Sequence, residues 1–173
     1  MPRHRHDPSK NLVGFLVGEV MYGVRIEVVR EIVNPLAVVA LPRAPKAVRG
    51  VADYRGVVVP VVDLRDRFGL PPAPISRKTK WIVLDVSPAG GTGSYVALVV
   101  DAVTEVFGYG AGGIRPAPPL GSGDDVRGIE GVTTFGPEPR ERLVFVLDAR
   151  AFGALAEAAL GGETSSGRAS ETL

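Results

Sequence analysis

The side chains that most often perform acid, base or nucleophilic chemistry are scarce in this chain. Cysteine does not occur, and the histidines are His4 and His6, close to the N-terminus. A His-x-His pair binds a metal ion only weakly unless further ligands join it, so we interpret both side chains as solvated. The commonest general bases and nucleophile pairs of enzymes are therefore missing from the body of the chain.

Carboxylates and a glycine-rich segment are the remaining candidates for chemistry. The aspartates at or near the ends of apolar segments are Asp63, Asp85, Asp101 and Asp148. Aspartate at such places usually caps turns and helices, and no pair among the four has a context typical of catalysis or metal binding. The glycines of residues 90–93 precede a strand pattern rather than a helix, which argues against a phosphate-binding loop.

Charge and composition limit the kind of partner. The 173 residues carry a formal charge of +1, and 6% of them are aromatic. A barrel that binds nucleic acid would be expected to expose aromatic side chains among basic ones, so this function and a small enzyme are kept only as alternatives. No apolar run approaches the roughly 18 residues of a membrane span, and residues 1–11 lack the apolar core of a secretory signal. We expect a soluble, cytoplasmic protein.

The elements that would position these groups are short strands. With 22 glycines, 15 prolines and 45% hydrophobic residues, the chain has the composition of an all-β barrel or sandwich. A short amphipathic helical turn is predicted over residues 26–33, and a terminal helix over 148–160 with Phe152, Leu155 and Leu160 on its packing face. Strands are predicted at residues 12–17, 22–24, 57–62, 81–86, 95–107, 128–132 and 142–149.

The most informative of these segments surrounds residues 57–62, a β-branched run typical of a strand that is buried on both faces. Pro60 interrupts the run. Because proline has no N–H for a ladder, it predicts an edge position, a bulge or a passage between sheets. Asp63 is predicted to cap a short helical turn after the strand. Before the strand, Gly50 and Gly56 bracket a tight polar corner.

A series of short motifs runs through most of the chain, from about residue 12 to residue 156. In order, they are Tyr22-Gly23-Val24 continuing to Glu31-Ile32, Gly50-Val51, Arg55-Gly56, Pro60-Val61, Asp63-Leu64-Arg65, Ile114-Arg115-Pro116, and Leu147-Asp148. Together they resemble the signature of the CheW family, the adaptor proteins of bacterial chemosensory arrays. The chain departs from this pattern at Asp53 and Tyr54, where the family usually has Asn-Leu.

The resemblance implies an all-β fold of two SH3-like, five-stranded β-barrel subdomains, packed around a shared hydrophobic core, with short helical turns and a C-terminal helix. It places the CheW-like domain at residues 11–158, between a disordered lead (1–10) and a flexible tail (159–173). It also implies a non-catalytic adaptor that requires no cofactor and no metal ion. In the family, such an adaptor couples the cytoplasmic tip of a chemoreceptor to the regulatory domain of a CheA-type histidine kinase.

The partners implied by the resemblance are thus a chemoreceptor, a CheA-type kinase and other CheW-like proteins in rings, with no binding of nucleic acid and no insertion into a membrane. The protein would be cytoplasmic and would join receptor arrays through its partners. A coupling module of a non-chemotactic pathway, acting in development or gene regulation, is an alternative with the same fold.

Carried over residue by residue, the receptor-contacting surface of the family falls on Arg55, Val29 and Gly50. We expect Arg55 to lie beside the groove that receives the receptor, although a corner arginine can also pair with a neighbouring carboxylate. Val29 has the alternative role of a core residue, and Gly50 that of a glycine required for its backbone angles. Tyr54 and Asp53 flank Arg55, and their departure from the pattern predicts an altered preference for the receptor.

Overall fold

The computed structural model describes residues 10–88, 91, 93–109, 112–117 and 128–161. The predicted lead up to residue 9, with both histidines, and the predicted tail from residue 162 lie outside these residues. The described elements, in chain order, are β1 (Asn11–Val17), β2 (Val20–Arg25), the 3-10 turn η2 (Ile26–Val28), β3 (Val29–Val33), β4 (Val48–Tyr54), β5 (Val57–Asp63), α1 (Leu64–Arg67), β6 (Lys80–Asp85), β7 (Tyr95–Val100), β8 (Ala102–Gly108), β9 (Ile129–Phe135), β10 (Arg142–Leu147) and α2 (Ala149–Gly161).

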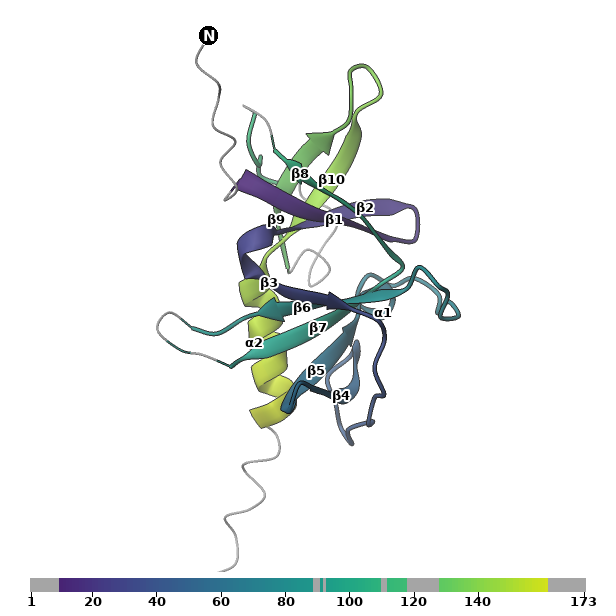
Figure 1. The fold of residues 1–173 in the computed structure, drawn as a ribbon, viewed down its shortest axis with the longest axis vertical. Coiled ribbons are helices and arrows are strands. Elements are labelled where there is room, and N and C mark those ends of the chain that lie inside the picture. The colour runs from purple at the N-terminus through teal and green to yellow at the C-terminus, as the bar shows by residue number, and fades with distance from the viewer. Residues whose placement is uncertain (1–9, 89–90, 92, 110–111, 118–127, 162–173) are drawn as a thin grey trace, which may run out of the picture.

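The described strands form two sheets of five strands each, in the orders β8-β1-β2-β10-β9 and β3-β6-β7-β5-β4. Figure 1 shows the first sheet in the upper part of the molecule and the second sheet, with α2 beside it, in the lower part. The second sheet uses one continuous stretch of chain, whereas the first joins β1 and β2 to β8, β9 and β10 through a parallel pairing of β2 with β10. The arrangement confirms the expected pair of five-stranded, SH3-like subdomains.

The chain passes from the second sheet to the first at Asp101, between β7 and β8. The prediction of one strand over residues 95–107 is therefore wrong. The Asp101 backbone N–H donates to the Leu16 carbonyl at 2.9 Å, so this residue already belongs to the first barrel. Both halves of the segment are rich in β-branched residues, and neither glycine nor proline marks the break. Asp101 itself is the one turn-favouring residue at this point, and it was not enough to predict the break.

Apolar side chains are buried in three layers, one inside each barrel and one between the barrels. Along β6, Trp81 and Val83 point into the second barrel, whereas Ile82 and Leu84 point into the layer between the barrels. A strand with both faces buried in this way becomes a continuous apolar run, as the sequence shows. The layer inside the first barrel consists of Leu12, Met21, Phe107, Val144 and Val146.

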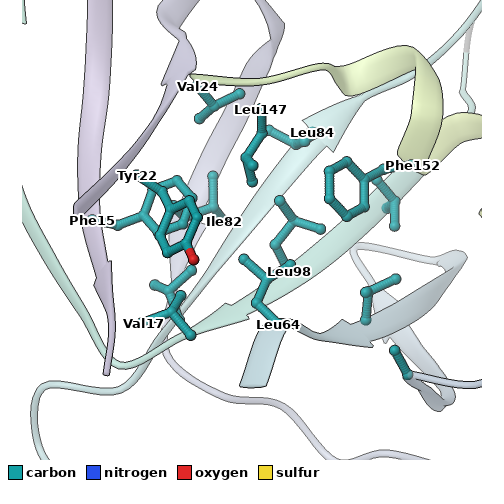
Figure 2. Packing of buried hydrophobic residues seen from close by; sticks show 14 of the residues in the cluster. Phe15, Val17, Tyr22, Val24, Leu64, Ile82, Leu84, Leu98, Leu147 and Phe152 are labelled. Carbon is teal, nitrogen blue, oxygen red and sulfur yellow. The ribbon is translucent and has the colours of Figure 1, made fainter. Parts of the chain in front are cut away.

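The layer between the barrels is the largest of the three. In Figure 2, Phe15 and Tyr22 of the first barrel face Ile82 and Leu98 of the second, and Phe152 of α2 lies across the same layer. Burial of each large apolar side chain contributes about 1.5–3 kcal/mol. Separation of the barrels would expose many such side chains at once, and the two barrels are therefore held as one unit.

Helix α2 packs against this layer mainly through Phe152, Ala156 and Ala159, which are buried on one face. The small alanines let the helix lie close to β5 and β7. Leu155 is partly buried as predicted, but Leu160 is exposed because it lies one residue beyond the buried stripe, on a different side of the helix. The helix continues to Gly161, so the first three residues of the predicted tail are helical.

The helical turn predicted over residues 26–33 forms only at η2. Its second half is strand β3, in which Arg30 and Ile32 are exposed while Glu31 and Val33 are half-buried. β3 pairs antiparallel with β6. Val29, Ile32 and Val33 have helical spacing, but β-branched residues favour extended chain. Hydrogen bonding to β6 then stabilises the strand rather than the helical turn.

Asp63 occupies the position that the sequence predicts, whereas Pro60 lies at none of the three predicted places. Its strand β5 is paired on both sides, with β7 and β4, and the register shift of the β4–β5 pairing lies between Val48 and Gly50. Val51, opposite Pro60 in β4, exchanges both of its backbone hydrogen bonds with Val39, so Pro60 stands at a non-hydrogen-bonded position of the β4–β5 ladder. Asp63 ends β5 and caps α1, because its Oδ1 accepts from the Arg65 N–H at 3.0 Å. Its other oxygen accepts from the Arg49 guanidinium.

A polar contact at Asp101 ties the two barrels together. Asp101 Oδ2 accepts from the Gly18 N–H of the β1–β2 turn at 2.6 Å, and Oδ1 accepts from Arg65 Nε of α1 at 2.9 Å. Burial alone would raise the pKa of Asp101, but the hydrogen bonds from Arg65 and from the Gly18 N–H lower it below its ordinary value. One carboxylate thus serves both barrels.

Asp101→Asn is expected to lower the free energy of unfolding by about 1 to 2 kcal/mol, because the amide group turns a donor towards one of two existing donors. Urea unfolding followed by circular dichroism measures this loss. Asp85→Asn is the matched control. Asp85 accepts from the nearby Ser87 within one loop and, among the described residues, joins no contact between the barrels, so its replacement should cost less than about 0.5 kcal/mol. Equal losses in the two variants would contradict a special role for Asp101.

Candidate functional site

The polar corner predicted between Gly50 and Gly56 is the turn of the β4–β5 hairpin. Tyr54 pairs with Val57, and the two residues between them have φ angles of 49° (Arg55) and 81° (Gly56). Two left-handed residues in a two-residue loop form a type I′ turn, which matches the twist of the flanking strands. Asp53 Oδ1 accepts from the Gly56 N–H at 2.8 Å and braces the turn.

Arg55 is an unusual residue for the first position of such a turn, where Asn, Asp or Gly is preferred. Its head group is held by Glu31 of β3, because Nε donates to Oε2 at 2.9 Å and Nη2 donates to Oε1 at 2.7 Å. This two-point geometry fixes the plane of the guanidinium. Arg55 thus pairs with a carboxylate, as the alternative predicted, and its side chain is nevertheless 69% exposed to solvent.

Tyr54 adds a third member to this cluster. Its ring is buried in the second barrel, 6.0 Å from the Tyr95 ring in an edge-to-face contact. Its hydroxyl donates a hydrogen bond to Oε2 of Glu31. The Glu31 carboxylate therefore accepts hydrogen bonds from the hydroxyl of a buried tyrosine on one side and from the guanidinium of an exposed arginine on the other.

The cluster shifts the acid–base properties of its members. Hydrogen bonds from Arg55 and from Tyr54 lower the pKa of Glu31 from 4.5 to about 2. Burial of Tyr54, together with its bond to the Glu31 carboxylate, raises the pKa of the hydroxyl. Glu31 is therefore ionised, and Tyr54 keeps its proton, throughout the physiological range.

The cluster also closes the second barrel. β3 and β4 are the outer strands of its sheet order, and the contacts of Glu31 with Tyr54 and Arg55 join their ends. Elsewhere along β4, the outer edge is covered by an isolated pairing of Val39 with Val51. Side-chain contacts thus replace a continuous ladder at this seam.

The other two predicted residues have structural roles of their own. Gly50 has a φ angle of 149°, and an added Cβ would lie 2.0 Å from the Val39 carbonyl oxygen. A side chain does not fit there. The alternative role considered for Gly50, a glycine required by the local backbone, is therefore enough to explain this residue. Val29 begins β3, two residues before Glu31, and is half-buried against the layer between the barrels.

A hollow of about 280 Å³ lies between the barrels, away from this cluster. Tyr22 and Phe145 of the first barrel and Lys46 and Phe68 of the second line it. Tyr22 and Phe68 are stacked, with ring centroids 4.7 Å apart. Arg55 and the other four predicted site residues are absent from its lining, so the expected proximity of Arg55 to a groove is not met by this hollow.

Glu31 is the member of the cluster that the sequence analysis missed. It lies within one of the motifs, but in the segment for which a helical turn is predicted. In a strand, alternate side chains share a face, so Glu31 would lie on the same half-buried face as Val29 and Val33. The alternation of residues 29–33 could therefore have identified it.

Comparison with known proteins agrees with this architecture. The family model described as "CheW-like domain" matches residues 11–156. The chain belongs to the CheW-like domain family.

Among the relatives of this CheW-like chain are proteins named Chemotaxis protein CheW. That of Rhizobium meliloti is 32% identical over 120 residues, which are 69% of this chain and 74% of the relative. That of Klebsiella aerogenes is 31% identical over 134 residues, 78% of this chain and 75% of the relative. Protein FrzA of Myxococcus xanthus is 36% identical over 115 residues, 66% of this chain and 68% of the relative.

A solved structure shares the CheW-like fold. The crystal structure of the scaffolding protein TtCheW from Thermoanaerobacter tengcongensis superposes with a TM-score of 0.68 at 28% identity, covering 86% of this chain and 90% of the other. The likeness extends over both barrels and supports the two-barrel description.

The four aspartates that the sequence singles out in this CheW-like domain are engaged in structural contacts. Asp63, Asp85 and Asp148 accept from the backbone N–H two residues further on, as the capping interpretation predicted. The described residues hold no group of three or more His, Asp, Glu or Cys side chains placed to bind a metal ion. None of the helices in the described part of the chain is long and apolar enough to cross a membrane.

The first prediction from this site concerns pH. Because the folded pKa of Glu31 lies below its ordinary value, the pairing stabilises the fold fully above about pH 4.5, and this contribution is lost as the pH falls towards 2. The carboxyl ¹³C chemical shift of Glu31, followed by NMR from about pH 7 downwards, should therefore change near pH 2. In Arg55→Gln the midpoint should move up towards the ordinary value. A wild-type midpoint near 4.5 would contradict the cluster.

The second prediction tests the structural role of Gly50. Gly50→Ala is expected to lower the free energy of unfolding by more than about 2 kcal/mol, because the Cβ would collide with the Val39 carbonyl. Gly56→Ala is the matched control: its φ angle is also positive, but no atom lies within 4 Å of the added Cβ, so the loss should be about 1 kcal/mol. Denaturant unfolding compares them, and a stable Gly50→Ala protein would refute the collision.

Proposed function

We propose that this chain is a non-catalytic adaptor that joins the cytoplasmic tip of a chemoreceptor to the regulatory domain of a CheA-type histidine kinase. The observation that carries the proposal is the match of the CheW-like family model to residues 11–156. The engagement of the carboxylates in capping and ion pairs supports a role in docking rather than in catalysis. The adaptor acts in the cytoplasm and reaches the membrane-proximal array through its partners.

A rigid body suits this task. The layer between the barrels and the Asp101 contact hold the two halves in one orientation, so a partner bound to one barrel is placed at a fixed angle to a partner on the other. A signal that changes the receptor's shape can then reach the kinase without being absorbed by a hinge between the barrels. Ring formation with other CheW-like barrels follows the same requirement, since a ring closes only at a constant angle.

The receptor-binding surface in this proposal is centred on Arg55. Its guanidinium is anchored at one edge and exposed to solvent on the rest of its surface. Asp53 and the type I′ turn set the position of the Arg55 backbone, Tyr54 supports the cluster from inside the barrel, and Val29 supplies an apolar contact at the start of β3. A helical receptor hairpin can place an apolar stripe and a polar acceptor on such a surface.

A second candidate differs in the pathway and not in the coupling. FrzA, at 36% identity, is not named as a chemotaxis protein, so a CheW-like module of a pathway that controls development or gene regulation is retained. Co-purification from cells, with identification of the receptor and kinase that come down together, assigns the pathway. Failure to recover any CheA-type kinase or receptor would overturn both candidates.

Arg55→Glu is expected to weaken binding of the chemoreceptor fragment at least about tenfold, because it reverses the charge at the centre of the surface and faces Glu31 with a second carboxylate. The fold should remain intact, since an exposed ion pair contributes little to stability. Isothermal titration calorimetry measures the affinity and circular dichroism the fold. Arg150→Glu, at a side chain that is 94% exposed on α2, is the matched control. Unchanged receptor affinity in Arg55→Glu would remove Arg55 from the site.

A further inference from the structure

The hydroxyl of Tyr54 is the part of the cluster that sets this chain apart from the motif that it otherwise follows. A leucine at this position would fill the same barrel interior but could not donate a hydrogen bond. Here the hydroxyl donates to Oε2 of Glu31, which also accepts from Arg55 Nε. A tyrosine at this position can therefore orient Glu31, and through Glu31 it can orient Arg55, whereas a leucine cannot.

We propose that Tyr54 is a specificity-determining positioning residue, whose hydroxyl holds the Glu31 carboxylate and thereby fixes the Arg55 guanidinium so that its outward N–H groups meet an oxygen acceptor on the partner. This inference rests on the proposed function, in which Arg55 contacts the receptor. It adds the residue that sets the geometry of that contact and the chemistry of the group that Arg55 binds.

The hydrogen-bond inventory of Arg55 defines this partner chemistry. A guanidinium has five N–H donors. Glu31 takes one from Nε and one from Nη2, and the guanidinium carbon lies 5.9 Å from the centre of the Tyr54 ring. The Nη1 donors and the second Nη2 donor therefore face away from Glu31 on an exposed side chain. A side-chain carboxylate or amide oxygen of the partner satisfies these donors.

Tyr54 is suited to positioning because it is the rigid member of the cluster. Its side chain is 4% exposed and packs edge-on against the Tyr95 ring, so its hydroxyl is a fixed point on the wall of the barrel. An exposed Arg–Glu pair without such a point exchanges readily with water, and its geometry is weakly defined. The hydroxyl orients Glu31 from the interior and so reduces the freedom that Arg55 would lose on binding.

The backbone of Arg55 is fixed as well as its head group. The residue adopts a left-handed conformation in the type I′ turn, and the Asp53 carboxylate accepts from the next N–H along the chain. With the Cα position set by the turn and the guanidinium set by Glu31, the long side chain is restrained at both ends. A surface arginine prepared in this way discriminates between partners by the direction of the acceptor, not only by charge.

Tyr54→Phe removes the hydroxyl and keeps the ring. We expect its affinity for the purified cytoplasmic signalling hairpin of a chemoreceptor from the same genome to fall roughly two- to tenfold in calorimetry. Tyr95→Phe is the matched control: it removes the same atom from the neighbouring ring, whose hydroxyl has no hydrogen bond with the described residues, and should bind as wild type does. Repeating the titrations at low and high salt distinguishes a carboxylate acceptor, whose binding weakens with salt, from an amide.

Two spectroscopic readouts report positioning directly and do not depend on the receptor. In the wild type, the Arg55 Nε–H NMR signal should exchange slowly with water, and in Tyr54→Phe it should exchange faster. The titration midpoint of Glu31 should also rise in Tyr54→Phe, because the carboxylate loses one donor. Unchanged exchange and an unchanged midpoint would overturn the positioning role.

A double-mutant cycle tests whether Tyr54 acts through Arg55. If it does, Tyr54→Phe should have no further effect on receptor affinity in an Arg55→Gln background. Loss of affinity in Arg55→Gln with none in Tyr54→Phe would overturn this inference and leave the proposed function standing. Absence of receptor binding by the wild type would overturn the proposed function, while the NMR readouts would still decide whether the hydroxyl positions Arg55.

Discussion

The apolar layer shared by the two barrels is the constraint on which the rest of the structure depends. Each barrel has its own small interior, but Phe15, Tyr22, Ile82 and Leu98 are covered only because the barrels face each other across this layer. Helix α2 completes the layer with Phe152. The relative orientation of the two halves is therefore set mainly by the same burial that stabilises the fold.

Polar contacts refine this arrangement at its margins. Asp101 and Arg65 join the crossover to α1, and the cluster around Glu31 closes the seam of the second barrel. At the exposed part of the Glu31 cluster, a structural contact coincides with the proposed binding surface: the ion pair that closes the barrel also presents Arg55 to solvent.

Much of the fold could be predicted because local signals and burial agree. The β-branched run before Asp63 forms β5, and Asp63 caps α1 as its position indicates. The failures occurred where pairing partners decide the structure. The segment after Ile26 has helical spacing but forms β3, because β6 offers a ladder. The break at Asp101 has neither glycine nor proline, and a contact with Gly18 of the distant β1–β2 turn stabilises it. Glu31 was missed for the same reason, as its partners lie on a strand that is distant in sequence.

The interleaved connection of the strands governs how the protein is built. The second sheet is made from residues 29–100 alone, so it can complete itself as soon as that stretch has left the ribosome. β1 and β2 are synthesised first, yet β2 must wait for β10, at residues 142–147, for its parallel neighbour. During synthesis the chain is thus a finished barrel with an unpaired hairpin at its start, and a chain cut short before β10 would leave that edge open to self-association. The first sheet is therefore complete only when β9 and β10, the last strands to be synthesised, have paired.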